Sequence, residues 1–442
     1  MAADGFTSEL ARELAPDALE RFLRYVRIDT QSDPRSDTFP STAKQLDLSR
    51  LLVAELRAMG LEDAELDEHG YVFASLPARG GEGRPTVGLV AHVDTSPEVS
   101  GTGVRPHVTR YGGGELPLPG DPSQVLSPDD APELEHHVGH DLVTSDGTTL
   151  LGADDKGGVA EIMAAAAYLA RHPELERGNV SIAFTPDEEI GLGAEHFDLD
   201  RFGAEVAYTL DGSTSGEVQD ETFSALAVRV IFRGRGIHPG SAKGRLVNAV
   251  KLASAFVESL PRDRLSPETT EEREGFVHPM RIEGDIETCT VGLILRDFDE
   301  DELAGHEALV RRLADEAAAR DERAAVEVEV SRTYSNMKVF LREHPRAVAA
   351  AREAVRRAGL EPTSSVIRGG TDGARLSERG LPTPNLFTGG HGYHSLREWI
   401  CVQDMGAAAA TIVHLVQIWS ERGNDEGAAG APSSQPIAAP SG

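Results

Sequence analysis

The segment Gly88–Pro97, GLVAHVDTSP, decides the fold of this chain. It starts as an apolar run that predicts a strand over residues 86–93, and it ends in two polar residues, His92 and Asp94. Side chains alternate faces along a strand, so His92 and Asp94 point the same way at its carboxyl end. Open α/β sheets bind their ligands at that end of their strands. Because such a pair is also common as a purely structural feature, other residues must decide its role.

Outward from this strand, short apolar runs alternate with amphipathic helices. Strands are predicted over residues 71–76, 86–93, 180–184 and 206–210, and helices over 18–28, 41–59 and 157–169. Ser41 is the expected N-cap of the second helix, and Gly60 is expected just beyond its carboxyl end. The alternation predicts an α/β fold in which a mixed sheet is flanked by helices.

The pattern changes after residue 212. A long alternating strand at 225–232 is followed by a helix at 247–260, a charged loop, a strand at 290–295, a helix at 302–320 and a strand at 325–330. These elements predict a smaller α+β domain over 213–332, inserted into a main domain made of 1–212 and 333–422. Helices at 345–358 and 404–419 and a short strand at 365–368 complete the main domain. Residues 423–442 consist mostly of Gly, Ala, Pro and Ser and are predicted to be disordered.

The composition excludes several classes of function. The 442 residues include 43 Lys and Arg against 73 Asp and Glu, which gives a net charge of -30. Such a surface repels phosphate backbones and anionic lipids, so we expect no nucleic-acid or membrane partner. No apolar run is long enough for a spanning helix, and no leader is recognised at the start, so the sequence predicts a cytoplasmic protein. The two cysteines, Cys289 and Cys401, match no metal or redox spacing.

Four further segments end strands or turns in polar residues. LLGADDKGG places Asp154 and Asp155 before a helix, and FTPDEEIGLGA ends an apolar strand in Asp187, Glu188 and Glu189. YTLDG ends in Asp211, and FTGGHGYHSLREWI carries His391 and His394 after a Gly-Gly turn. Each segment also has a purely structural interpretation: an aspartate before a helix can simply cap it, and an acidic loop is ordinary in a chain of this charge.

Together these residues favour a metal site. Several carboxylates and histidines at neighbouring strand ends, without cysteine, are typical ligands of a hydrolytic site with two Zn, Mn or Co ions. A carboxylate at such a site can bridge two ions, because each of its oxygens can face one of them. Glu188 beside Glu189 is the natural general acid/base, and Asp94 can orient His92 as an outer-shell group.

The motifs, taken in order, resemble the M20 metallopeptidases, and within them the tripeptide aminopeptidases, from about Leu19 to Trp419. The motifs that carry the resemblance are RIDTQS (27–32), AHVDTSP (91–97), TLLGADDKGG (149–158), FTPDEEIG (184–191), HPGSAKGRLVNA (238–249), LRDFD (295–299), IRGGTDGARLS (367–377) and PTPNLFTGG (382–390). The stretch that leads to the last histidine departs from the usual pattern, because His391 stands where an aromatic residue is usual.

The resemblance assigns a role to each candidate residue. It implies that His92 and Asp211 bind one metal, that Glu189 and His394 bind the other, and that Asp154 rather than Asp155 bridges them. His394 is preferred to His391 as the ligand because of its spacing to Glu398. The resemblance also makes Glu188 the general acid/base and Asp94 the support of His92. It implies two Zn²⁺ per subunit, with Co or Mn as substitutes.

The inserted domain is expected to act as a lid and to form a homodimer. In M20 dimers the histidine equivalent to His238 often reaches the partner's site and polarises the scissile carbonyl, which is an oxyanion-type role. Arg368 is expected to bind a substrate carboxylate, and Asn248 is a further candidate for a substrate contact. The histidines at 107, 136, 137, 140 and 278, together with Arg296, fit no ligand pattern in the sequence.

The resemblance therefore implies a metal-dependent aminopeptidase that releases the N-terminal residue from tripeptides. A water that bridges the metals would attack the first peptide carbonyl, and Glu188 would move its proton to the leaving amine. A dipeptidase, a carboxypeptidase or an N-acyl amino acid hydrolase would use the same metals with a different substrate pocket. A binding protein that has lost catalysis is a further alternative, although it would not need Glu188 and Asp94.

Overall fold

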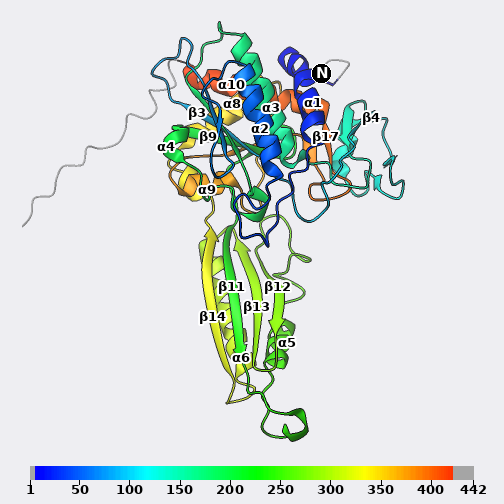
Figure 1. The fold of residues 1–442 in the computed structure, drawn as a ribbon, viewed down its shortest axis with the longest axis vertical. Coiled ribbons are helices and arrows are strands. Elements are labelled where there is room, and N and C mark those ends of the chain that lie inside the picture. Colours follow the sequence, from blue (N-terminus) through cyan, green and yellow to red (C-terminus); the bar gives the residue numbers. More distant parts are fainter. Residues whose placement is uncertain (1–4, 422–442) are drawn as a thin grey trace, which may run out of the picture.

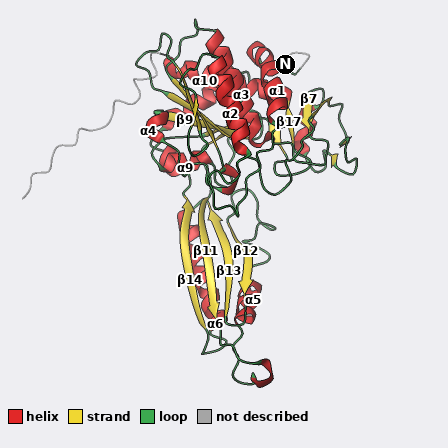
Figure 2. Ribbon diagram, viewed as in Figure 1, coloured by secondary structure: helices red, strands yellow, loops and turns green. Residues whose placement is uncertain are grey.

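The structure, a computed structural model, describes residues 5–421. Its centre is a seven-stranded sheet with the order β1-β2-β8-β3-β9-β15-β10 (Figures 1 and 2). β8, β3, β9 and β15 run parallel, β2 and β10 join them antiparallel, and β1 pairs antiparallel with β2. The strands are β1 (Glu65–Leu66), β2 (Val72–Leu76), β3 (Val87–His92), β8 (Val180–Thr185), β9 (Val206–Gly212), β10 (Val218–Gln219) and β15 (Asn385–Phe387). The prediction of a mixed sheet is confirmed.

Helices cover both faces of this sheet. The larger layer packs on a core of buried Ala, Leu, Val and Ile side chains, and it consists of α1 (Glu9–Tyr25), α2 (Gln45–Ala58), α3 (Ala153–Arg171), α8 (Pro345–Arg357) and α10 (Val402–Ser420). The other face carries α4 (Leu199–Phe202) and α9 (Asp372–Glu378) over an aromatic cluster. α3 and α10 bury nearly every residue, as helices between a sheet and other helices must. The α/β fold class is confirmed.

A second, smaller sheet lies beside the main one. Its order is β16-β17-β7-β4, and all of its pairs are antiparallel. It consists of β4 (His107–Arg110), β7 (Asp141–Thr144), β16 (Gly390–His391) and β17 (Trp399–Cys401), with the ribbon β5 (Leu116–Pro117) and β6 (Val125–Leu126) and the 3-10 turn η1 (Pro132–His137) nearby. We call this unit the side sheet. The hairpin of β16 and β17 carries His394 at its turn.

The third unit is elongated and extends away from the central sheet (Figure 1). An antiparallel sheet with the order β12-β13-β11-β14 is covered on one face by two helices, which enclose a core of their own. Its elements are β11 (Ser224–Arg233), α5 (Ala249–Ser259), β12 (Phe276–Gly284), β13 (Thr288–Asp297), α6 (Glu300–Ala318) and β14 (Ala325–Tyr334), and α7 (Lys338–Leu341) follows. We refer to this unit as the lid.

The first two helices differ from the prediction at their starts. The first begins at Glu9, because Ser8 accepts a hydrogen bond from Ala11 and caps it. The second begins at Gln45, so Ser41 does not cap it; the Ser41 hydroxyl instead bonds to Asp187. The predicted stop is confirmed: Gly60 follows the last turn at φ +93°, which glycine adopts without strain.

One predicted strand and one predicted loop were wrong. Residues 365–368 form a single bridge between Ile367 and Thr222 rather than a strand, because this segment runs beside the sheet without a continuous ladder. The predicted charged loop before residue 290 contains the strand β12. β12 is an edge strand with an irregularity near Pro279, which an edge position tolerates, and most of its side chains are exposed.

Over the described residues, no helix combines the length and apolarity needed to cross a bilayer.

Candidate metal and active site

The parallel strands bring the polar residues of the sequence motifs to one edge. His92 is the last residue of β3 and pairs with Thr185 at the end of β8. Glu188 and Glu189 follow β8 in the 3-10 turn η2 (Glu188–Ile190), and Asp211 lies at the end of β9. These strands are buried on both faces, so their polar residues emerge only at the carboxyl ends.

Asp154 faces both histidines of the cluster. Its Oδ1 lies 2.9 Å from His92 Nε2, and its Oδ2 lies 3.2 Å from His394 Nε2. Asp211 Oδ1 is 3.7 Å from the same nitrogen of His92, and Glu189 Oε2 is 2.9 Å from His394 Nε2. The structure therefore brings these five residues together as two pairs with Asp154 between them.

Asp94 supports the cluster from behind. It is fully buried, its Oδ1 lies 3.3 Å from His92 Nδ1, and its carboxylate accepts the backbone N–H groups of Glu188 and Glu189. Asp155 is also buried and turns away from the histidines. Its carboxylate accepts the backbone N–H groups of His92 and Gly158, so it joins the strand end to α3.

Glu398 holds the loop that carries Asp154. Its buried carboxylate accepts the backbone N–H groups of Leu151 at 2.8 Å, Gly152 at 2.7 Å and Asp154 at 3.0 Å. In the sequence, Glu398 is noted only for its spacing to His394. No local motif marks this role, because the three donors lie more than two hundred residues away in the chain.

The electrostatics of the cluster show an excess of acidic groups. Burial and the nearby Asp154 raise the pKa of Glu189 to about 8 and that of Asp211 to about 6. Burial opposes protonation of His394, but hydrogen bonds with Asp154 and Glu189 outweigh it and raise the pKa of that imidazole to about 11. Burial also raises the pKa of Glu188 well above its usual range. The carboxylates therefore need positive charge that the neighbouring side chains do not supply in full.

The donor set fits divalent cations. Atoms of His92, Asp154 and Glu189 lie within 4.8 Å of one another, as do atoms of His92, Glu188 and Asp211. Glu189 Oε1 is buried and has no hydrogen-bond partner. Imidazole nitrogens and carboxylate oxygens at such separations are suitable ligands for Zn, Co or Mn. Geometry alone would also admit Glu188 as a ligand.

A cleft of about 630 Å³ opens over these residues, between the central sheet and the lid. Asp154, Glu188, Glu189, Asp211 and His394 line one part of it, and Arg296, Tyr334 and Arg375 line another. The Nε of Arg296 is buried without a hydrogen-bond partner, whereas its Nη1 donates to the carbonyl of Arg368. Arg296 lies in β13 of the lid and fits no ligand pattern in the sequence.

Three of the predicted substrate contacts lie elsewhere in this chain. Arg368 turns toward the loop at 270–272 and bonds to Thr270 and to the carbonyl of Glu272, outside the residues that line the cleft. His238 is exposed beyond the far end of β11, and the ten residues of that strand span about 30 Å. Asn248, near the same end, caps α5 by accepting the N–H of Lys251.

Comparisons with known proteins identify relatives of the whole chain. The model of peptidase family M20/M25/M40 matches residues 137–418. A peptidase T of Geobacillus thermodenitrificans is 45% identical over 92% of this chain and 99% of its own length. A peptidase T of Desulfitobacterium hafniense is 47% identical over 91% and 98%.

Solved structures share the fold. The aminopeptidase PepT of Bacillus cereus superposes with a TM-score of 0.70 at 22% identity, covering 92% of this chain and 99% of its own. A dinuclear metal-binding M20 peptidase of Bacillus subtilis superposes with a TM-score of 0.62 at 15% identity, covering 92% and 98%. The shared fold, the identity to the curated relatives and the family match show that this chain belongs to the M20/M25/M40 peptidase family.

Proposed function

We propose that this protein is a metal-dependent aminopeptidase that releases the N-terminal residue from tripeptides. The observation that carries the proposal is the buried cluster in which Asp154 directs one oxygen to His92 and the other to His394. The peptidase T relatives, which align over almost the whole chain, support the tripeptide specificity.

The residues present would hold two zinc ions. His92 and Asp211 would bind one, Glu189 and His394 the other, and Asp154 would bridge them. Two such cations supply Lewis acidity to the substrate carbonyl and lower the pKa of a water molecule. Cobalt or manganese suits the same oxygen and nitrogen donors.

Glu188 would move the proton during hydrolysis. Its side chain lines the cleft beside His92 and Asp211, and its backbone N–H is fixed by Asp94. As a carboxylate it accepts the proton of the attacking water, and as the acid it returns that proton to the leaving amine. Asp94 would keep His92 in one orientation, in the manner of a carboxylate behind a metal-bound histidine.

The substrate carboxylate would bind Arg296 rather than Arg368. Arg296 lines the cleft beside Tyr334, whereas the Arg368 guanidinium does not line it and bonds to Thr270 and to the carbonyl of Glu272. A fixed cation at one end of the cleft and the metal cluster at the other would select peptides by their length.

His238 would act on the cleft of a second subunit. Its distance along β11 excludes its own cleft, so a role in catalysis requires a homodimer through the lid. The exposed apolar residues Met280 and Ile282 on the edge strand β12 support an interface there. Mixing a His238→Ala chain with a Glu188→Gln chain tests this arrangement. Activity that reappears in the mixture supports action across subunits, and a mixture as inactive as its parts contradicts it.

Hydrolysis of a dipeptide, a tripeptide and a tetrapeptide of the same residues tests the proposed function. We expect the tripeptide to be cleaved much faster than the other two, and an N-acetylated tripeptide to resist cleavage. Equal cleavage of the acetylated and free tripeptides would refute an aminopeptidase. A dipeptide cleaved fastest would make the protein a dipeptidase.

A further inference from the structure

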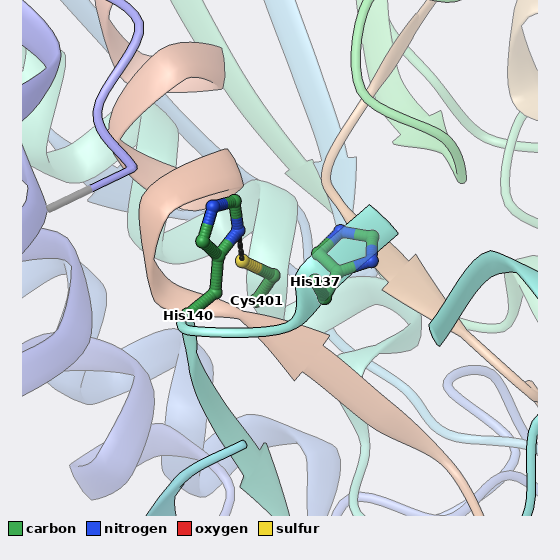
Figure 3. A group of neighbouring side chains, drawn as sticks. All are labelled: His137, His140 and Cys401. Carbon is green, nitrogen blue, oxygen red and sulfur yellow. Dashed lines mark hydrogen bonds between the residues drawn. The ribbon is translucent and has the colours of Figure 1, made fainter. Parts of the chain in front are cut away.

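A second group of metal-ligating side chains lies where the side sheet meets α10, and it shares no residue with the catalytic cluster. His137 ends η1, His140 immediately precedes β7, and Cys401 ends β17. One atom of each lies within 4.8 Å of the others. Figure 3 shows the Cys401 sulfur between the two imidazoles, with His140 Nδ1 facing it at 3.6 Å.

The hydrogen bonds of His137 fix its tautomer. Its Nδ1 lies 2.8 Å from the carbonyl oxygen of Glu133, which can only accept, so Nδ1 carries the hydrogen. Its Nε2 lies 2.8 Å from Asp404 Oδ2, in the first turn of α10. Metal-binding histidines commonly donate one ring N–H to a backbone carbonyl and turn the other nitrogen to the metal.

Asp404 joins the group through His137. The Cys401 thiol donates to Gln403 Oε1 at 3.5 Å, and burial and the Asp404 charge raise the pKa of that thiol. Glu161 of α3 is buried with no hydrogen-bond partner on either oxygen, and burial and Asp404 raise its pKa as well. A cation among these groups would offset the clustering of acidic side chains in the interior.

The spacing agrees with a tetrahedral zinc ion. Zn–N bonds of about 2.0 Å and Zn–S bonds of about 2.3 Å place nitrogen and sulfur ligands of one ion about 3.5 Å apart. His140 Nδ1 and Cys401 Sγ are 3.6 Å apart. His137 must close on His140 and Cys401 from at most 4.8 Å, while His137 Nε2 and Asp404 Oδ2 must separate slightly. Side-chain movements of about 1 Å accomplish both.

We propose that His137, His140, Cys401 and Asp404 form a structural zinc site that fastens the side sheet to α10. Binding forms four ligand bonds and releases the thiol proton of Cys401, and the proton shared by His137 and Asp404, to solvent. The site lies at the base of the β16–β17 hairpin, whose turn carries His394. Occupation therefore stabilises the hairpin that presents a residue of the catalytic cluster.

Cobalt spectroscopy of the full chain tests the proposal independently of peptidase activity. The catalytic cluster contains no cysteine, so a thiolate-to-cobalt charge-transfer band after chelation and reloading with Co²⁺ reports on Cys401 or Cys289 alone. We expect the band in the natural chain and in Cys289→Ser, which serves as the matched control because Cys289 is buried in the lid core. We expect no band in Cys401→Ser.

A second variant provides the same test if Cys401→Ser does not fold. His140→Gln alters a half-buried residue and should also abolish the band while cobalt still enters the catalytic cluster. The proposal is refuted if the natural chain binds cobalt without any thiolate band. Cys401 would then bind no metal, and His137 and Asp404 would form only a hydrogen bond. A band that survives Cys401→Ser would refute it as well.

Discussion

The carboxylate of Glu398 offers a sharp test of how the site is held in place. It accepts three backbone N–H groups, and two of the three bonds converge on Oε2. In Glu398→Gln, the amide oxygen can keep the bonds to Leu151 and Gly152. The amide nitrogen then faces the N–H of Asp154, and two donors oppose each other.

The expected cost follows from this geometry. Burial raises the pKa of Glu398 to about 7, so the comparison is made above that pH, where the group is ionised. A hydrogen bond to a charged group contributes about 1.5–3 kcal/mol, and a buried donor left unpaired costs a similar amount. We therefore expect Glu398→Gln to lower the free energy of unfolding of the metal-free protein by about 2–4 kcal/mol. Because Asp154 loses its fixed position, zinc affinity should fall by about 10- to 100-fold.

Urea unfolding and zinc competition with a chelator measure these two effects. Glu329→Gln is a matched control, because its partly exposed pair with Arg229 should contribute less than about 1 kcal/mol. The reasoning is refuted if Glu398→Gln unfolds at the urea concentration of the natural chain and binds zinc with the same affinity.

Three further predictions concern proton transfer, substrate length and Glu221, which lies between β10 and β11. Glu188→Gln should retain its metal content by elemental analysis but lower kcat for a tripeptide by about 10²- to 10⁴-fold, and an undiminished kcat would remove Glu188 from the acid/base role. Arg296→Gln should lower kcat/KM for a free tripeptide by about 10- to 100-fold and leave a C-terminally amidated tripeptide unchanged; equal losses on both would show that Arg296 does not bind the carboxylate. Glu221 is desolvated, but bonds to Arg273 and Lys338 more than compensate and lower its pKa to about 2. A lowered pKa in the folded state stabilises the protein above the ordinary value near 4.5, and this stabilisation is lost as the pH falls toward 2. Glu221→Gln should therefore lower the free energy of unfolding by about 1–2 kcal/mol at pH 7, by a diminishing amount below pH 4.5, and a difference independent of pH would contradict this account.

The sequence predicted most accurately the features that follow from apolar strand patterns and short motifs. His92, Glu188 and Asp211 sit at the ends of apolar runs, so their placement at one edge follows from the parallel order of those strands. The alternating patterns of the lid likewise gave β11 and β13 near their observed positions. The edge strand β12 was missed because exposure on both sides of the strand erases the alternation.

Contacts between distant segments were not predictable from local patterns. Arg368 stands beside a Gly-Gly pair that lines the cleft, yet its guanidinium packs over Phe223 and Phe276 on another side. Arg296 lines the cleft because β13 of the lid lies next to the central sheet at that point, and no local sequence pattern indicates this. Cys401 and His140 showed no metal spacing in the sequence, since the side sheet joins two segments far apart in the chain.

We propose that metal ions held by His92, Asp154, Glu189, Asp211 and His394 drive peptide hydrolysis. Tripeptide hydrolysis by the full chain, after a chelator has removed its metal and then after addition of zinc, tests this directly. Hydrolysis should disappear on chelation and return to its starting rate with zinc. Full hydrolysis by a chain whose metal content has fallen below detection would show that the metal is not required.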